Sequence, residues 1–398
     1  MDDLKEYKGM VFLIKICILK ICSLLNKILK KKRNKICLVS FPDFSDNCMG
    51  VFNYIIKENL TQYEIVWLVN DLSIPDKISE LQLSFMVKVV KKNSLLGLLN
   101  YMTSKYIFYT HTPFNGVENL KKQIVINLWH GMPLKNIGYL DNKDEKNIPH
   151  FTYTIATSNE FQNVISKVFG VSKSKVLVTG LPRNDEINKF KNILSKLKIN
   201  GEIYNKKILW MPTFRKSVMA GIRNDGKHKN RKLPLLSNEE LEEFNKYLRD
   251  NNDLLVIKLH PMDYLKKKDF SKLSNIKIVT NCDFKNIGEQ LYSLFQEFDA
   301  FITDYSSVYF DFMLLNKPIG FVMDDLKEYS SSRGFVFEDI YDWIPGPIIK
   351  DVSELKTYIK NINNDIDDFK DIREEVNNKT NSYSNFNNTK RLFNELGL

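Results

Sequence analysis

Short apolar runs rich in β-branched residues alternate with helical stretches along the chain from residue 36 onward. Continuous apolar runs of this length are typical of parallel strands that are buried on both faces of a sheet. The first group of predicted strands comprises residues 36–41, 63–69, 86–90, 106–109, 124–129, 152–156 and 176–178. Helical stretches lie between several of them, so the pattern predicts a parallel sheet with crossover helices.

The alternation is interrupted once, at the stretch 196–207, and then resumes. The second group of predicted elements has strands at 208–211, 254–259, 276–279, 300–303 and 318–322, and helices near 238–250, 286–296, 306–316 and 352–362. With 398 residues the chain is long enough for two α/β domains. We expect these domains at 36–200 and 201–380, and a C-terminal helix in 381–398 that returns to the first domain.

Residues 8–30 gather lysines on one side and apolar residues on the other when they are plotted at the helical period. Lys15 and Lys20 interrupt any apolar run that could cross a hydrocarbon core of about 30 Å. We therefore interpret residues 1–35 as a basic amphipathic segment that lies on an anionic membrane surface. A helix packed within the fold and a membrane span are the alternatives.

The net charge of +10 is concentrated in two segments. Residues 1–35 contain ten Lys and Arg against three Asp and Glu, and residues 206–232 contain nine against one. Charge localised in this way indicates anionic lipids or phosphorylated substrates as partners, and no nucleic acid. The five cysteines show no CxxC spacing, and no secretory signal is evident, so we expect a cytoplasmic protein.

Candidate chemistry lies in four segments that each consist of an apolar strand followed by polar or turn-forming residues. They are INLWHGMPLK (126–135), ILWMPTFRK (208–216), LVIKLHPMD (255–263) and AFITDYSSVYFDF (300–312). His130 and His260 each follow such a strand directly, and prolines prevent the strand from continuing. A single histidine of this kind is usually structural. Two of them, in different predicted domains, indicate a shared site at the carboxyl ends of the strands, in a cleft between the domains.

The fourth segment closes a strand with Thr303 and Asp304 and places Ser306 and Ser307 at the start of a predicted helix. Such residues are commonly helix caps. The same geometry also offers backbone N–H groups and the positive end of a helix dipole to a phosphate group. Arg215 is a candidate for a second phosphate contact, with a solvated surface arginine as the alternative.

Taken in order, WHGMPLKNIG, MPTFR, KLHP, TDYSSVYFDF and RGFVF…PGPI (333–348) resemble the CDP-glycerol glycerophosphotransferase family of teichoic acid and capsule synthesis. The resemblance covers roughly residues 105–390, and the chain reads PTFRKS where the family often has PTWRD. It implies a GT-B-like pair of Rossmann-like domains facing a cleft. It also implies a peripheral enzyme at the cytoplasmic face of the plasma membrane, a donor that is CDP-glycerol or CDP-ribitol, and a lipid-linked saccharide acceptor.

The reaction implied by this resemblance transfers glycerol phosphate from CDP-glycerol to an acceptor hydroxyl and releases CMP. His130 is then the expected general base, because a neutral imidazole accepts a proton near pH 7, and His260 the second catalytic residue. The expected substrate-binding residues are Gly131, Pro133, Lys135, Thr213, Arg215, Lys258, Pro261, Thr303, Asp304, Ser306 and Ser307. No DxD element follows a predicted strand, so we expect neither an obligatory metal ion nor a cofactor.

Two further interpretations remain open at this point. A GT-B glycosyltransferase that uses a nucleotide sugar has the same architecture, and fold alone does not separate the two. A noncatalytic module that binds anionic lipid or nucleic acid through its basic segments is the other alternative. The sequence also leaves open whether one polyol phosphate or many are added, and whether the protein forms oligomers.

Overall fold

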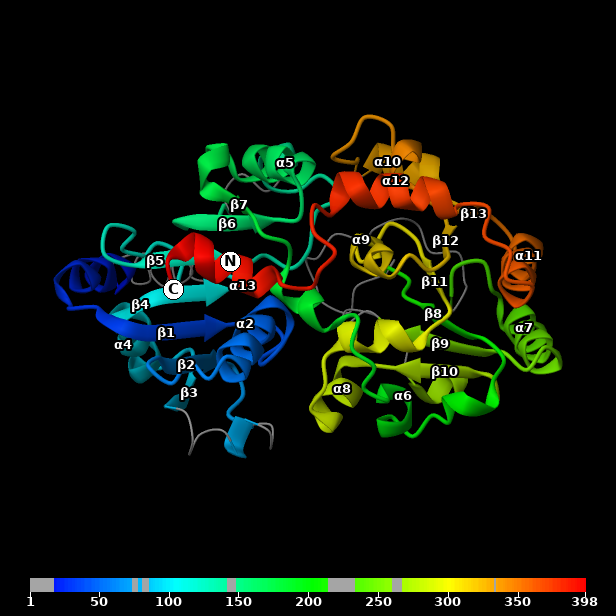
Figure 1. The fold of residues 1–398 in the computed structure, drawn as a ribbon, viewed down its shortest axis with the longest axis horizontal. Coiled ribbons are helices and arrows are strands. Elements are labelled where there is room, and N and C mark those ends of the chain that lie inside the picture. The colour runs from blue at the N-terminus through cyan, green and yellow to red at the C-terminus, as the bar shows by residue number, and fades with distance from the viewer. Residues whose placement is uncertain are drawn as a thin grey trace, which may run out of the picture.

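The computed structural model describes residues 18–73, 78–80, 86–141, 148–213, 233–259, 267–332 and 334–398. Two sheets lie side by side, each covered by helices (Figure 1). The first has seven strands in the order β3-β2-β1-β4-β5-β6-β7, and the second has six in the order β10-β9-β8-β11-β12-β13. All pairs of neighbouring strands in both sheets run parallel. We call the part built on the first sheet the N-terminal half and the other part the C-terminal half.

The strands agree with those predicted from the apolar runs to within a few residues. In the first sheet they are β1 (Lys32–Val39), β2 (Glu64–Val69), β3 (Val87–Lys91), β4 (Ser104–Tyr109), β5 (Ile124–Asn127), β6 (Tyr153–Ala156) and β7 (Val176–Val178). In the second they are β8 (Lys207–Trp210), β9 (Leu254–Lys258), β10 (Ile276–Val279), β11 (Ala300–Thr303), β12 (Ile319–Val322) and β13 (Ile348–Ile349). Only β13 was not predicted, because two residues are too few to show a period.

The helices were predicted less well than the strands. Besides the helical residues 18–28, the α-helices are α2 (Asp46–Lys57), α4 (Leu95–Thr103), α5 (Asn159–Phe169), α6 (Ile193–Lys196), α7 (Asn238–Asp250), α8 (Asn281–Ile287), α9 (Tyr309–Phe312), α10 (Leu326–Ser332), α11 (Val352–Asn363), α12 (Lys370–Thr380) and α13 (Asn388–Leu396). The helices predicted at 238–250 and 352–362 are confirmed as α7 and α11.

The predicted helices at 286–296 and 306–316 are wrong. Gly288 adopts a left-handed conformation with φ 67° and ends α8, and a 3-10 helix, η7 (Leu291–Glu297), follows it. In the other segment only the four residues of α9 are α-helical, and a 3-10 turn ends at Asn316, whose φ of 49° is also left-handed. Gly288 interrupts the first predicted helix, whereas the second begins only at Tyr309 and passes into a 3-10 turn after Phe312.

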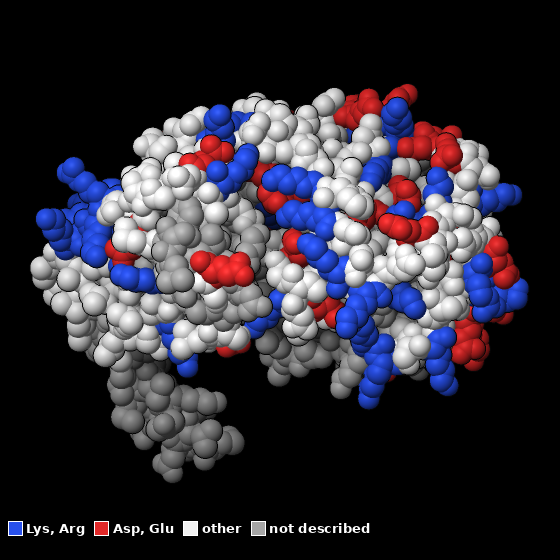
Figure 2. All heavy atoms as spheres, turned by 60° about the horizontal axis from the view of Figure 1, so that its bottom comes forward, with Lys and Arg blue, Asp and Glu red and all other residues white. Residues whose placement is uncertain are grey.

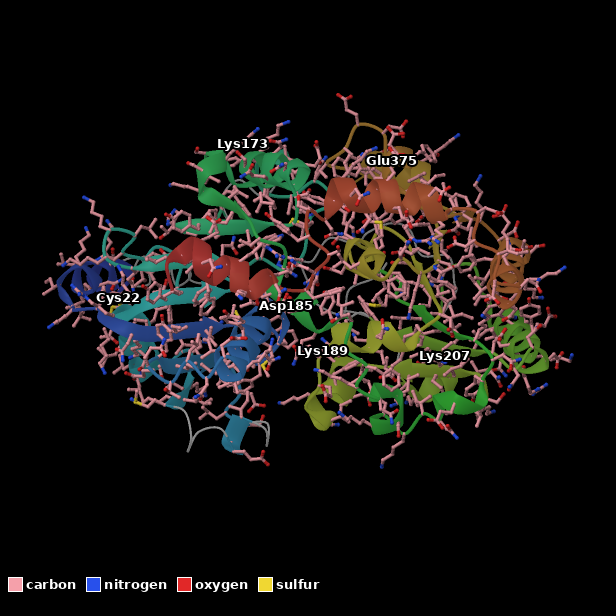
Figure 3. The ribbon with its side chains drawn as sticks, in the orientation of Figure 1. Cys22, Lys173, Asp185, Lys189, Lys207 and Glu375 are labelled. Atoms are coloured by element: carbon pink, nitrogen blue, oxygen red, sulfur yellow. The ribbon has the colours of Figure 1, made fainter. Side chains whose placement is uncertain are left out.

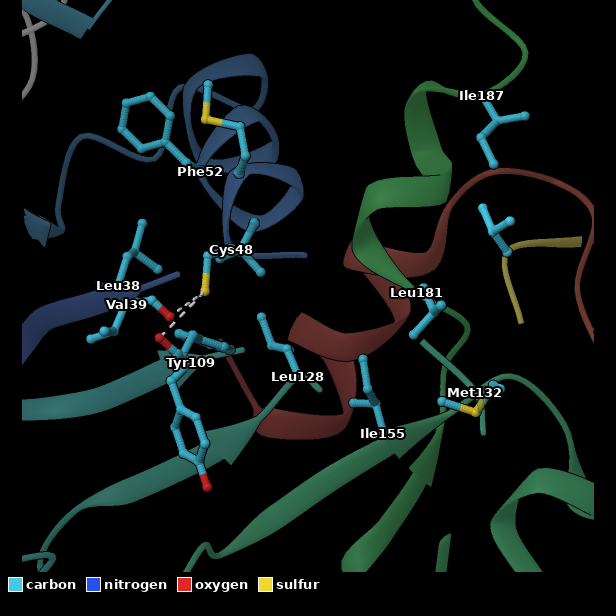
Figure 4. Packing of buried hydrophobic residues seen from close by; sticks show 14 of the residues in the cluster. Leu38, Val39, Cys48, Phe52, Tyr109, Leu128, Met132, Ile155, Leu181 and Ile187 are labelled. Atoms are coloured by element: carbon cyan, nitrogen blue, oxygen red, sulfur yellow. Dashed lines mark hydrogen bonds between the residues drawn. The ribbon is translucent and has the colours of Figure 1, made fainter. Parts of the chain in front are cut away.

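Helix α2 is anchored directly over the ends of two central strands. The Cys48 thiol donates to the carbonyl oxygens of Val39, at the end of β1, and of Phe108, in β4, at 3.3 and 3.5 Å (Figure 4). Leu128, Ile155 and Leu181 belong to the same buried cluster. This packing fixes the N-terminus of α2 at the carboxyl edge of the first sheet, where ligands bind in folds of this kind.

The last helix, α13, lies on the N-terminal half after the chain has crossed back from α12 (Figure 1). Its Phe393 ring is stacked on Phe108 with ring centroids 6.1 Å apart. The Asp185 carboxylate, labelled in Figure 3, accepts hydrogen bonds from the backbone N–H groups of Asn388 and Thr389 at 2.8 and 2.9 Å. The tail therefore ties the two halves together at the crossing point.

Of the predicted membrane-surface segment, residues 1–17 lie outside the described residues, and residues 18–28 form a helix. The buried Asn26 side chain donates to the Gln123 side chain at 2.9 Å, and the Asn119 side chain donates to the Asn26 carbonyl oxygen at 3.0 Å. One face of this helix is thus packed on the fold, as one of the alternatives had it. Within the described ranges, none of the helices has the length and apolar character that crossing a bilayer requires.

Candidate functional site

A cavity of about 740 Å³ lies between the two halves, at the carboxyl edges of both sheets. Eight of the sequence-predicted site residues line it, namely His130, Gly131, Pro133, Lys135, Thr213, Lys258, Ser306 and Ser307. Thr303 and Asp304 are buried behind its wall. Arg215, His260 and Pro261 lie outside the described residues. The structure therefore brings together candidates from residues 130 to 307 in one place, as the strand-end pattern predicted.

The turn that carries His130 is held by side chains from other segments. The Asn47 side-chain amide, at the start of α2, donates to the carbonyl oxygens of Leu128 and Trp129 at 3.0 and 3.1 Å. Arg183 Nη1 donates to the carbonyl oxygen of His130 at 2.9 Å. Gly131 has a φ of 132°, and a side chain there would approach Arg183 Nη2 to 3.0 Å. A glycine is therefore required at this position, and the backbone of His130 is fixed on both sides.

The His130 ring is part of an aromatic stack. Its centroid lies 5.0 Å from that of His111, with the ring planes 19° apart, and 4.1 Å from the Trp129 ring. His111 follows β4, the strand next to β5, so its position at the sheet edge matches that of His130. Sequence reasoning missed His111. The available signal was the segment YTHTPF, in which a histidine again follows an apolar strand directly.

Burial between the two halves lowers the pKa of His130 from 6.5 to about 4, because protein atoms replace the water that would solvate an imidazolium. His111 and Arg183 lower this pKa further, while Asp46 and the Thr110 carbonyl raise it. Part of the His130 side chain is exposed to the cavity, where water works against the desolvation. Whether burial or water in the cavity dominates, the pKa stays below 7. The ring is therefore neutral at pH 7, as a proton acceptor has to be.

The opposite wall of the cavity is fixed by a hydrogen-bonded pair at the ends of β8 and β11. The backbone N–H of Thr213 donates to both carboxylate oxygens of Asp304, at 3.1 and 3.0 Å, and the Thr213 hydroxyl donates at 2.8 Å. The Thr303 hydroxyl donates to the Met211 carbonyl oxygen at 3.1 Å. The described contacts of Thr303 and Asp304 hold two strand ends together, and Thr213 is the member of this group that lines the cavity.

Ser306 and Ser307 do not begin a helix, contrary to the prediction. Helix α9 starts at Tyr309, its N-cap residue is Val308, and no side chain caps it. A helix of four residues contributes little dipole, so the predicted phosphate contact through a helix N-terminus loses its basis. What the two serines offer is their hydroxyl groups, which are half-buried in the cavity wall and have no hydrogen-bond partner among the described residues.

Lys258 places a positive charge at the end of β9, in the same wall. Its ammonium group donates to the Leu259 carbonyl oxygen at 2.8 Å. Burial lowers the pKa of Lys258 from 10.5 to about 8, and Asp283 offsets part of this effect. At pH 7 the group is therefore protonated, and an anion in the cavity would relieve the cost of its burial.

Among the described residues, no group of three His, Cys, Asp or Glu side chains is placed to hold a metal ion. The Asp325 carboxylate, which follows β12, accepts a hydrogen bond from the Tyr305 hydroxyl at 2.7 Å. The expectation that the reaction needs no metal ion was made from the sequence and stays a prediction.

Comparison with known proteins matches residues 21–397 to a family model described as CDP-Glycerol:Poly(glycerophosphate) glycerophosphotransferase. The teichoic acid glycerol-phosphate transferase of Staphylococcus aureus is 26% identical over 374 residues, which cover 87% of this chain and 89% of that protein. The teichoic acid ribitol-phosphate primase of Bacillus spizizenii is 25% identical over 351 residues, covering 83% of each. A structure of a histidine-to-asparagine variant of the wall teichoic acid polymerase TagF, soaked with CDPG, superimposes with a TM-score of 0.73 at 21% identity. The superposition covers 99% of this chain and 95% of the chain in that structure, which shows a shared fold.

The environment of His130 predicts a titration that direct measurement checks. In ¹H–¹³C spectra of the protein labelled at histidine, we expect the His130 resonance to titrate with a midpoint below pH 6.5, because burial and the nearby His111 and Arg183 disfavour the imidazolium. His130→Gln assigns the resonance, and His150→Gln, which changes an exposed histidine paired with Glu118, serves as the control. A midpoint at or above 6.5 would contradict the proposed neutral ring.

Proposed function

We propose a function for this chain from the premise that it belongs to the CDP-Glycerol:Poly(glycerophosphate) glycerophosphotransferase family, whose model matches residues 21–397. The protein transfers a polyol phosphate, in the first instance glycerol phosphate, from its CDP-linked donor to a hydroxyl group of a lipid-linked saccharide. The product is an intermediate of a teichoic acid or a related capsule polymer. The observation that carries this proposal is one cavity, with a neutral histidine from the N-terminal half and a buried lysine from the C-terminal half.

In the proposed reaction the oxygen of an acceptor hydroxyl attacks the β-phosphorus of the CDP-polyol. A P–O bond to the acceptor forms, the P–O bond to the bridging oxygen breaks, and CMP leaves with the electron pair of that bond. His130 accepts the proton of the attacking hydroxyl through the ring edge that is open to the cavity. The stacked rings of His111 and Trp129 restrict the orientation of the imidazole, which favours a productive geometry.

The opposite wall is suited to the charge of the donor. The diphosphate of the donor is negatively charged, and negative charge builds up on CMP as it leaves. A buried ammonium group stabilises this charge more than a solvated ammonium group does. Lys258 supplies that group, and the hydroxyls of Ser306 and Ser307 supply hydrogen-bond donors without competing protein partners among the described residues. His260 and Arg215, which the resemblance assigns to the same task, remain predictions.

Two alternative donors follow from the relatives and the fold. The primase of Bacillus spizizenii is named for ribitol phosphate, so CDP-ribitol is the second candidate. Two parallel sheets that face one cavity support a GT-B-like architecture, which nucleotide-sugar transferases also use. Inhibition of transfer by CDP and by UDP separates CDP-linked donors from UDP-sugars. Stronger inhibition by CDP indicates a CDP-polyol, and stronger inhibition by UDP indicates a UDP-sugar.

The proposal predicts that the purified protein transfers labelled glycerol phosphate from CDP-glycerol, or ribitol phosphate from CDP-ribitol, to a lipid-linked disaccharide. In His130→Ala we expect transfer to fall by about 10²–10⁴-fold, because the proposed proton acceptor is removed. His150→Ala, the matched control, keeps transfer within about twofold, since this exposed histidine does not line the cavity. Transfer only from a UDP-sugar would overturn the proposed donor, and near-normal transfer by His130→Ala would remove His130 from the reaction.

The pKa of Lys258 predicts how kcat/KM for the donor changes at alkaline pH. Its positive charge is present below pH 8 and is lost as pH rises through about 8, so kcat/KM for the donor should fall there. Lys258→Met should lower kcat/KM at pH 7 by about 10- to 100-fold, as expected for a charged hydrogen bond. It should also remove the fall near pH 8.

The control for Lys258 is Lys207→Met. Lys207, labelled in Figure 3, begins the neighbouring strand β8 at the edge of the sheet away from the cavity. This variant should keep the wild-type profile. An unchanged alkaline limb in Lys258→Met would show that another group binds the diphosphate.

We propose in addition that the protein binds the cytoplasmic face of the membrane through residues 18–28. Five side chains of this helix form what we call the apolar helix face, namely Ile18, Ile21, Leu24, Leu25 and Ile28, which are between 46% and 72% exposed. Lys20 and Lys27 lie along one side of this face, and Lys and Arg side chains gather at the same end of the molecule (Figure 2). Exposed apolar groups beside lysines bind at the interface of an anionic bilayer.

Sedimentation with vesicles tests this second proposal. The double variant Leu24→Glu with Ile28→Glu should bind vesicles of phosphatidylglycerol about tenfold more weakly than the wild type, because it replaces buried apolar area with repelled charge. Ile203→Glu with Ile366→Glu, two exposed positions in other segments, should bind as the wild type does. Equal binding of all three proteins, or equal binding to uncharged phosphatidylcholine vesicles, would refute it.

A further inference from the structure

Arg183 joins the two halves of the molecule through a buried ion-pair network. It lies in the 3-10 helix η4 (Pro182–Glu186) and is only 5% exposed. Its Nη1 donates to the carboxylate of Asp46, the first residue of α2, at 2.9 Å, and its Nη2 donates to the carboxylate of Asp311 in α9 at 2.7 Å. Asp46 belongs to the N-terminal half and Asp311 to the C-terminal half, so one guanidinium group bridges both.

The same guanidinium group holds the turn of His130. Arg183 Nη1 also donates to the His130 carbonyl oxygen at 2.9 Å, and the Tyr292 ring covers the guanidinium carbon at 4.2 Å. The backbone N–H of Arg183 donates to the Asn47 side-chain oxygen at 3.1 Å. Because the Asn47 amide holds the carbonyls of Leu128 and Trp129, three consecutive carbonyls before Gly131 are bound by this network.

The network extends to the donor side of the cavity. Asn184 donates to the second carboxylate oxygen of Asp311 at 2.8 Å, so both oxygens of Asp311 are engaged by the N-terminal half. A Cβ built at Gly131 would lie 3.0 Å from Arg183 Nη2 and 3.6 Å from the Ser307 hydroxyl. The bridge therefore lies beside both the turn that carries His130 and Ser307 of the opposite wall.

We propose that Arg183 is a positioning residue for the transfer reaction, which locks the C-terminal half onto the N-terminal half in the arrangement that holds His130 opposite the donor. The inference rests on the proposed function. Removing one partner of a buried ion pair leaves an uncompensated charge, so the native arrangement is strongly preferred as long as all three charged groups are present. Lysine cannot replace arginine here, because it lacks the planar fork that reaches two carboxylates and a carbonyl together.

The pKa of His130 distinguishes a positioning role of Arg183 from a purely structural one. Four groups act on the ring: His111 and Arg183 disfavour protonation, and Asp46 and the Thr110 carbonyl favour it. Loss of the Arg183 charge should therefore raise the pKa of His130, and loss of the Asp46 charge should lower it. General loosening of the fold would move both values in one direction, toward that of a solvated histidine.

The experiment compares wild type, Arg183→Met, Arg183→Lys, Asp46→Asn and Asp311→Asn by the His130 titration and by kcat and KM for the donor. In Arg183→Met the midpoint should rise by at least about half a pH unit, and in Asp46→Asn it should fall. Arg183→Lys and Asp311→Asn should keep folded protein but lower kcat by about tenfold or more, because the bridge is broken while the wall residues remain.

Arg373→Met is the matched control. Arg373 is also fully buried and paired, with Asp367 and Asn316, but it does not line the cavity. This variant should lower the melting temperature and leave the His130 midpoint and kcat unchanged. The inference is overturned if Arg183→Met leaves the midpoint unchanged, or if Arg183→Lys and Asp311→Asn keep a wild-type kcat.

The titration also separates this inference from the proposed function. A wild-type protein that transfers nothing from either CDP-polyol would refute the proposed function, while opposite shifts in Arg183→Met and Asp46→Asn would still support the bridge. If Arg183→Met does not fold, Asp46→Asn still tests the shift of the His130 midpoint, and Asp311→Asn still tests the loss of kcat. If the His130 midpoint shifts in the same direction in Arg183→Met and in Asp46→Asn, the bridge is refuted whatever the transfer activity of these variants.

Discussion

Two parallel sheets that present their carboxyl edges to one cavity are the constraint on which the rest of the structure depends. In each sheet the strand order reverses at the first strand, between β1 and β4 and between β8 and β11. The chain leaves adjacent strands in opposite directions at such a reversal, which opens a crevice for ligands. His111 and Thr213 each follow a strand at these reversals, and His130 follows the adjacent strand β5. The candidate chemistry is therefore a consequence of topology.

The cavity walls are held by contacts between halves and not by either sheet alone. Asn47, Arg183 and Asp311 come from three segments that are far apart in the chain, yet they fix the turn of His130. α13 returns to the N-terminal half and is capped there by Asp185. These contacts hold the two walls of the cavity at a fixed separation.

The strands and the strand-end residues could be predicted from the sequence because both are local properties. His130 was found because it follows an apolar run, Lys258 entered only through the family resemblance, and His111 was missed although it shows the same signal as His130. Arg183 was out of reach, because its partners are 137 and 128 residues away along the chain. The helix predicted at 306–316 failed because burial on all sides of Phe310 and Phe312 imitates the apolar face of a longer helix.

The most direct measurement of the central claim is a crystal structure with CDP-glycerol bound to the unmodified protein. The account predicts the diphosphate within hydrogen-bond distance of Lys258 and the hydroxyls of Ser306 and Ser307, with the β-phosphorus facing the His130 ring across a gap that admits an acceptor hydroxyl. A donor bound away from this cavity, or bound with its β-phosphorus turned away from His130, would contradict it.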